Sequence, residues 1–172
     1  MSTDLAAQVA ALQGLVADLT ARVATLEDHR AIAALIASYG PAVDAAIPEA
    51  VGAIWTEDGV YDVDVVTLTG REEIEAMVTG EMHQGYVRQG CAHVLEPADI
   101  RIDGDTAVAT AKSMLVVADP GGAGFTVARA TANRWELDRV DGVWRCRRRI
   151  ARLLDGRAEA RDLLARGVRE RL

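Results

Sequence analysis

The chain has 172 residues, of which 50% are hydrophobic and 26% charged, so one domain of ordinary size can bury a core without disulfides. Its formal net charge of −7 argues against a nucleic-acid partner, because phosphate binding needs a clustered basic surface. Cys91 and Cys146 form no CxxC pair, and the N-terminus lacks the basic and apolar regions of a secretory signal. No apolar run approaches membrane-spanning length. We therefore expect a cytoplasmic protein with reduced thiols and no membrane contact.

The first 29 residues carry a heptad repeat of apolar side chains. Valine and leucine alternate in steps of four and three, at Leu5, Val9, Leu12, Val16, Leu19, Val23 and Leu26. This spacing keeps one seam of a helix facing a partner helix, so we expect residues 1–29 to form a coiled-coil-like arm. Together with the sheet, this arm is expected to assemble a homo-oligomer. Valine at one core position and leucine at the other favours a dimer. The alternative is a long surface helix folded back on its own domain.

After the arm, the sequence predicts helices first and strands later. A helical pattern runs to Tyr39, where Gly40-Pro41 predicts a break, and helices return at 47–59 and 70–80, on either side of a strand at 60–66. From residue 91 the sequence pattern is typical of long strands, with Asp-Gly hairpin turns at 103–104 and 141–142. The expected strands are 91–102, 106–118, 125–140 and 143–154.

This order of elements predicts an α+β fold: a cone-shaped, curved antiparallel sheet wrapped around the N-terminal helices. We expect residues 30–155 to form this domain and residues 156–172 to form a closing amphipathic helix.

Tyr39, Asp44 and His93 are the candidate catalytic side chains. His93 lies in a core-like strand, whereas His29 ends the arm and His83 falls in a polar loop. Each candidate taken singly has a structural interpretation, as a core histidine, a helix cap or a core tyrosine. Together they form a general base, an acid that fixes its tautomer and a hydrogen-bond donor. Residues five apart lie about 140° apart around a helix, but a break at Gly40-Pro41 lets phenol and carboxylate converge.

Three other features of the sequence bear on its chemistry. The arginines of 145–152 face both ways, so they form either an interface and salt bridges or, through Arg148 or Arg152, a site for a substrate oxyanion. Cys91 shares a strand face with His93, yet nothing indicates an activated thiolate. We expect no metal, because further ligands at suitable spacing are missing, and no cofactor, because no phosphate-binding loop is present.

Five segments together resemble the SnoaL-like superfamily. They are "YGPAVD" (39–44), "WTEDGVYDVD" (55–64), "GREEIEAMV" (70–78), "AHVLEPADIRIDGDTAVATA" (92–111) and "RVDGVW" (139–144). The resemblance covers roughly residues 28 to 155 and implies the cone-shaped fold of nuclear transport factor two. Within the superfamily the sequence resembles scytalone dehydratase, bile acid 7α-dehydratase and hexachlorocyclohexane dehydrochlorinase, cofactor-free lyases with an Asp–His dyad.

The resemblance also implies roles for single residues. Asp44 and His93 fall at the dyad, and Tyr39 falls at a pocket tyrosine. Thr131 and Asn133 fall at two substrate-contacting positions. A second pocket histidine has no clear counterpart, and several related dehydratases are trimers, against the dimer that the heptad favours.

These observations lead to one expected function and two alternatives. We expect a dehydratase-like lyase that acts on a small hydrophobic cyclic substrate such as a polyketide, steroid or terpenoid. His93 would abstract a proton, Trp55 and Met114 would form the apolar wall, and Arg148 would contact the substrate. An isomerase or cyclase using the same dyad is the first alternative, and a non-catalytic ligand-binding or scaffold protein is the second.

Overall fold

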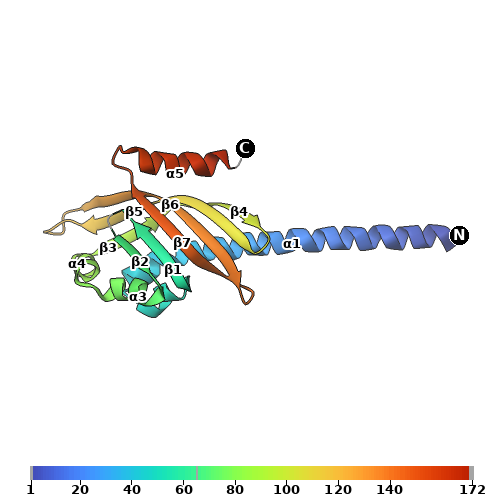
Figure 1. Ribbon diagram of the computed structural model, residues 1–172, viewed down its shortest axis with the longest axis horizontal. Coiled ribbons are helices and arrows are strands. Elements are labelled where there is room, and N and C mark those ends of the chain that lie inside the picture. The colour runs from blue at the N-terminus through green and yellow to red at the C-terminus, as the bar shows by residue number, and fades with distance from the viewer. Residues whose placement is uncertain (1, 65, 171–172) are drawn as a thin grey trace.

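One continuous helix, α1 (Ser2–Asp44), forms the N-terminal arm and then enters the domain (Figure 1). In this computed structural model, which describes residues 2–64 and 66–170, the predicted break at Gly40-Pro41 is wrong. Pro41 lies inside the helix, which runs on to Asp44. Burial explains why, since Ala42 and Val43 are packed into the core directly after the proline and hold this last turn in place. The expected boundary between residues 29 and 30 falls inside this one helix.

Three short helices lie between α1 and the long strands. They are α2 (Pro48–Gly52), α3 (Arg71–Thr79) and α4 (Glu81–Gln89). The helix expected at 70–80 is confirmed as α3. The polar loop expected around His83 is wrong, because this segment is α4 and His83 is buried in it.

A seven-stranded sheet supplies the other layer. Its order is β2-β1-β7-β6-β5-β3, with β4 paired to β5. All pairs are antiparallel except β1 with β7, which is parallel. The strand expected at 91–102 is interrupted after Leu95. The bounds are β1 (Trp55–Val63), β2 (Val66–Thr69), β3 (Cys91–Leu95), β4 (Asp99–Asp103), β5 (Thr106–Ala118), β6 (Phe125–Val140) and β7 (Val143–Leu153).

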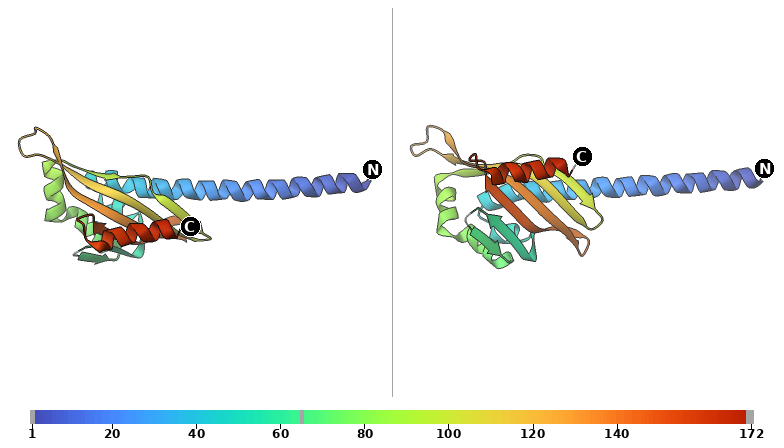
Figure 2. Two further views of the ribbon diagram at one scale, coloured as in Figure 1. Left: turned by 90° about the horizontal axis from the view of Figure 1, so that it is seen from above. Right: turned by 45° about the horizontal axis from the view of Figure 1, so that its top comes forward.

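Helices cover both faces of this curved sheet, which confirms the α+β fold class (Figures 1 and 2). Trp135 of β6 packs edge-on against Tyr39 of α1, with ring centroids 5.8 Å apart. The neighbouring Arg134 points to the other face and binds Glu170, which directly follows α5 (Ala158–Arg169). Adjacent residues of a strand face opposite ways, so α1 and α5 enclose β6 between them.

The arm is anchored where it meets the domain. Asp28 accepts hydrogen bonds of 2.8 and 2.6 Å from the guanidinium of Arg139 and one of 3.0 Å from the indole of Trp144. The hydrogen bond from Arg139 is the main reason that the pKa of Asp28 lies below its usual range. Before this anchor, every described side chain from Leu5 to Glu27 is exposed.

The α1 helix also corrects the expectation about membrane-spanning length. By length and composition alone, Leu5–Asp44 contains a stretch apolar enough to cross a membrane, and no part of that stretch is buried.

Candidate active site

The candidate site lies where the end of α1 meets β3, and Gly40 makes this close approach possible. A Cβ built on Gly40 would lie 2.4 Å from the carbonyl oxygen of His93. Glycine therefore permits helix and strand backbones to touch. This contact, rather than a helix break, brings Asp44 within reach of His93.

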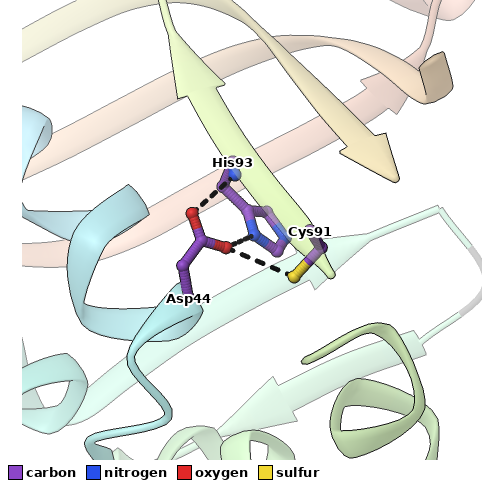
Figure 3. Close-up of side chains that lie close together, drawn as sticks. All are labelled: Asp44, Cys91 and His93. Carbon is purple, nitrogen blue, oxygen red and sulfur yellow. Dashed lines mark hydrogen bonds and ion pairs between the residues drawn. The ribbon is translucent and has the colours of Figure 1, made fainter. Parts of the chain in front are cut away.

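Asp44 and His93 form a dyad held by two hydrogen bonds (Figure 3). The distance from His93 Nδ1 to Asp44 Oδ1 is 2.6 Å, and the backbone N–H of His93 donates to Oδ2 over 2.8 Å. Because a carboxylate accepts, Nδ1 carries the ring proton and Nε2 keeps its lone pair. The side chain of Asp44 is 23% exposed and that of His93 is 21% exposed. Both are therefore partly protected from water but remain accessible. This geometry is that of an oriented general base.

The pKa of His93 lies below its usual value. Burial is the main cause, because it disfavours the charged imidazolium. Asp44 acts in the opposite direction, and the nearby His83 and Arg149 lower the pKa further. The imidazole is therefore neutral at pH 7 and able to accept a proton.

Cys91 completes a cluster of three possible metal ligands with the dyad. Its Sγ lies 3.6 Å from Asp44 Oδ1, and ligand atoms of the three residues lie within 4.8 Å of one another. Sequence reasoning missed the third ligand because Asp44 is 47 residues away from Cys91. Burial, with the Asp44 carboxylate adding to it, raises the pKa of the Cys91 thiol to about 11, which disfavours both metal binding and nucleophilic attack.

His83 is a second histidine beside the dyad that sequence reasoning left in a loop. Its Nε2–H donates to the carbonyl of Val43 over 2.8 Å, and its ring centroid lies 5.9 Å from that of His93. Only the helical geometry of α4 turns this side chain inward. The bond to the carbonyl fixes the backbone directly before Asp44.

A small cavity opens beside His93. Its volume is about 60 Å³. Its lining mixes apolar and polar side chains: Tyr61, His93, Ser113, Met114, Leu115, Arg129, Thr131, Arg149 and Ala151.

Arg149 is the most unusual residue of this lining. It is 2% exposed, and its guanidinium carbon lies 4.2 Å from the ring centroid of Tyr39, 4.8 Å from that of Tyr61 and 4.3 Å from that of Trp135. Its Nε and Nη2 donate to Asn133 Oδ1 over 3.1 and 2.8 Å. Among the described residues, Nη1 has no hydrogen-bond partner, and no carboxylate pairs with the charge. A buried cation with a spare donor is suited to an anionic group.

Asn133 and Thr131, both expected at the site, are buried there in one network with Ser113. Asn133 Nδ2 donates to Ser113 Oγ over 2.9 Å, and Ser113 Oγ lies 2.8 Å from Thr131 Oγ1. The amide oxygen of Asn133 therefore accepts hydrogen bonds from Arg149, and its amide nitrogen donates to Ser113 and Thr131. Within the described structure Asn133 positions its neighbours.

Of the other expected residues, Tyr39 and Met114 lie at the site, whereas Trp55 does not line the cavity. Tyr39 is buried against Arg149 and the dyad, with its ring centroid 6.3 Å from that of His93, and burial raises the pKa of its phenol, which stays protonated. Met114 lines the cavity. Trp55 lies deeper in the core, behind Tyr61, with ring centroids 5.4 Å apart.

Arg148 lies on the opposite face of β7 because of a bulge. Leu137 pairs with Cys146 and Glu136 pairs with Arg148, so Arg147 is an extra residue. The bulge shifts the alternation by one. Arg149 thus takes the buried face, and Arg148 reaches Asp62 at 3.5 Å.

Arg152 also forms a salt bridge with Asp62, in which Arg152 Nη1 lies 2.8 Å from Asp62 Oδ1. The hydrogen bond from Arg152 is the main reason that the pKa of Asp62 lies below its usual value. The expected contribution of Arg148 or Arg152 to the pocket is therefore corrected to Arg149.

Comparisons with known proteins place the chain in context. The model of the SnoaL-like domain matches residues 24–150. No curated protein matches the sequence. A solved NTF2-like protein with a cystatin-like fold from Novosphingobium aromaticivorans is 42% identical, covers 86% of this chain and 96% of its own, and superposes with a TM-score of 0.83.

Two more distant structures share the fold. A hexachlorocyclohexane dehydrochlorinase from Novosphingobium barchaimii is 18% identical, with 77% of this chain and 90% of its own covered and a TM-score of 0.67. A protein provisionally assigned as a scytalone dehydratase, from N. aromaticivorans, is 21% identical, with 75% and 85% covered and a TM-score of 0.64.

Proposed function

The chain belongs to the SnoaL-like domain family, and from this premise we propose that it is a cofactor-independent lyase of the dehydratase type. The observation that carries the proposal is the Asp44–His93 dyad beside a cavity that also holds the unpaired cation of Arg149. The two distant structures named above for lyases add support from fold only.

The reaction starts with proton abstraction by His93. Nε2 takes a proton from a carbon next to a carbonyl group, and the electron pair of that C–H bond moves toward the carbonyl oxygen. Asp44 fixes the tautomer of His93 and offsets the charge of the imidazolium. The pair then returns to form a C=C bond as the leaving group departs. If that group is hydroxide, the imidazolium gives its proton back and water leaves.

Arg149 is suited to meet the negative charge that develops on the carbonyl oxygen. Its free Nη1 is buried, so a hydrogen bond to an oxyanion there is not weakened by water. Asn133 and the three aromatic rings hold the guanidinium in place. Tyr39 remains a neutral donor close to the same group.

The cavity indicates a substrate that enters only in part. Its small open volume accepts a reacting end of a molecule, and Met114 and Leu115 provide apolar contact. We propose a hydrophobic cyclic β-hydroxy ketone as the substrate class. A substrate without a leaving group would be isomerised by the same proton transfer, because His93 can return the proton to another carbon.

A panel of cyclic β-hydroxy ketones tests the proposal. Wild type should form the enone, and His93→Ala should lose about 10²–10⁴-fold in kcat. His29→Ala is the matched control, since His29 lies in the arm and should not affect turnover. Equal turnover by His93→Ala and wild type would refute the dyad mechanism. Binding without turnover in either protein would favour a ligand-binding function.

A further inference from the structure

The arm of α1 projects away from the domain (Figures 1 and 2). It leaves a continuous row of large apolar side chains uncovered. The seven heptad residues from Leu5 to Leu26 are each between 45% and 68% exposed. Leu15, beside this row, is 54% exposed. An apolar surface of this extent marks an interaction site.

The same heptad phase continues from the arm onto the domain. The next core positions are Arg30, Ala33 and Ala37, and all three are exposed, whereas Ile32 and Ile36 are buried against the domain. A groove of about 330 Å³ borders this part of the helix. It is lined by Ala33, Ile36, Ala37, Leu95, Glu96, Pro97 and Ala98. The domain thus covers one side of α1 and leaves the seam open from Leu5 to Ala37.

Residue types along the seam indicate the number of strands and their direction. Valine occupies the a positions of the arm and leucine the d positions, a combination that favours two parallel strands. In this register Arg22 is at a g position and Glu27 at the following e position. In a parallel, in-register pair, g of one helix lies beside the next e of the other, so Arg22 meets the partner's Glu27.

We propose that α1 binds α1 of a second copy of this chain as a parallel, in-register, two-stranded coiled coil. The contact runs from Leu5 to Ala37, and the alanines allow the helices to approach closely where the domains begin. Asp44 and His93 come from one chain, so each subunit has a complete dyad. The proposal does not depend on the proposed catalytic function.

A membrane is the competing occupant, because part of α1 is apolar enough to cross one. Three observations favour the second copy. The large apolar residues form a stripe and do not surround the helix. Asp18 and Arg22, 4.0 Å apart, interrupt the apolar stretch. No tryptophan or tyrosine precedes Tyr39, so the aromatic anchors typical of a membrane interface are missing.

A matched pair of substitutions tests the seam. Val16 is a core position, and the neighbouring Ala17 is also solvent-exposed in the single chain but off the seam. Sedimentation equilibrium of wild type should give about 37 kDa, twice the chain mass of 18.4 kDa. Val16→Glu should give the mass of one chain, and Ala17→Glu should stay dimeric. Circular dichroism would verify that both variants keep the folded domain.

Charge reversal tests the direction and register. Arg22→Glu or Glu27→Arg alone puts like charges together twice per dimer and should raise the dissociation constant about tenfold. The double variant Arg22→Glu/Glu27→Arg restores opposite charges and should dimerise as wild type does. When the two single variants are mixed, they should pair with each other in preference to themselves.

Several results would overturn the proposal. A wild-type mass of one chain, or of three chains at about 55 kDa (three times 18.4 kDa), excludes the two-stranded assembly. Equal masses for Val16→Glu and Ala17→Glu would remove the seam. Failure of the double charge variant to recover would exclude the parallel register. Flotation of wild type with phosphatidylcholine vesicles would assign the arm to a membrane, whereas we expect the protein to stay in the lipid-free fraction.

Discussion

Substituting Gly40 by alanine tests how the dyad is built. The added Cβ would lie 2.4 Å from the carbonyl oxygen of His93, and real Cβ atoms almost never approach a neighbour closer than 3.0 Å. Helix and strand must therefore separate by at least about 0.6 Å, the difference between these two values. The neighbouring atom is backbone, so a side-chain rotation cannot relieve the clash.

A shift of this size is large enough to break a hydrogen bond of the dyad. The bond from the His93 backbone N–H to Asp44 is 2.8 Å long, and 0.6 Å more takes it past the usual limit of about 3.2 Å. Overpacking costs about 1–3 kcal/mol, and alanine gains back about 0.5–1 kcal/mol in helix propensity. The two contributions oppose each other, so we expect Gly40→Ala to lower the free energy of unfolding by up to about 2.5 kcal/mol.

Urea denaturation and NMR measure the two consequences separately. The His93 Nδ1 proton, held 2.6 Å from a carboxylate oxygen, should give a low-field signal in wild type that is lost in Gly40→Ala. Gly85→Ala is the control: Gly85 is also helical, and a Cβ there meets nothing within 4 Å. It should raise stability by about 0.5–1 kcal/mol. An unchanged midpoint and an intact low-field signal in Gly40→Ala would refute this account.

Three further predictions concern the reaction. The pKa of His93 is lowered by burial, so activity should fall only below about pH 6.5; in Asp44→Asn, which loses support for the imidazolium, the fall should move to lower pH and the maximum should drop. Arg149→Leu should reduce kcat about 10²–10³-fold and move the same limb to higher pH, because Arg149 lowers the pKa of His93. EDTA should leave turnover unchanged; a loss that zinc restores would assign a metal to Cys91.

The contact between Asp44 and His93 could be predicted from the sequence. The order of five loose segments led to the family, and it paired Asp44 with His93, 49 residues apart. The reason for their meeting differs from the prediction, because Gly40-Pro41 does not break the helix. Proline does disfavour a helix interior, but the packing of Val43 keeps the last turn helical.

The parts that could not be predicted depend on register and on tertiary packing. Strict alternation along β7 assigns the buried face to Arg148, and one inserted residue, Arg147, reassigns it to Arg149. A bulge of this kind has no clear signal in a run of arginines. His83 was missed for a similar reason, since the polar sequence around it resembles a loop and only packing against α1 shows that it is buried.

Burial of Arg149 destabilises the folded protein when the cavity holds no ligand. Stacking on three aromatic rings returns about 0.5–2 kcal/mol per contact, and Asn133 satisfies two of its nitrogens. The third nitrogen remains unsatisfied among the described residues, at a cost of about 1–3 kcal/mol. An oxyanion in the cavity removes that cost, and a neutral carbonyl oxygen does so less well because its hydrogen bond is weaker. In the proposed reaction the guanidinium would therefore favour the charged intermediate over the substrate, which is the difference that accelerates a reaction.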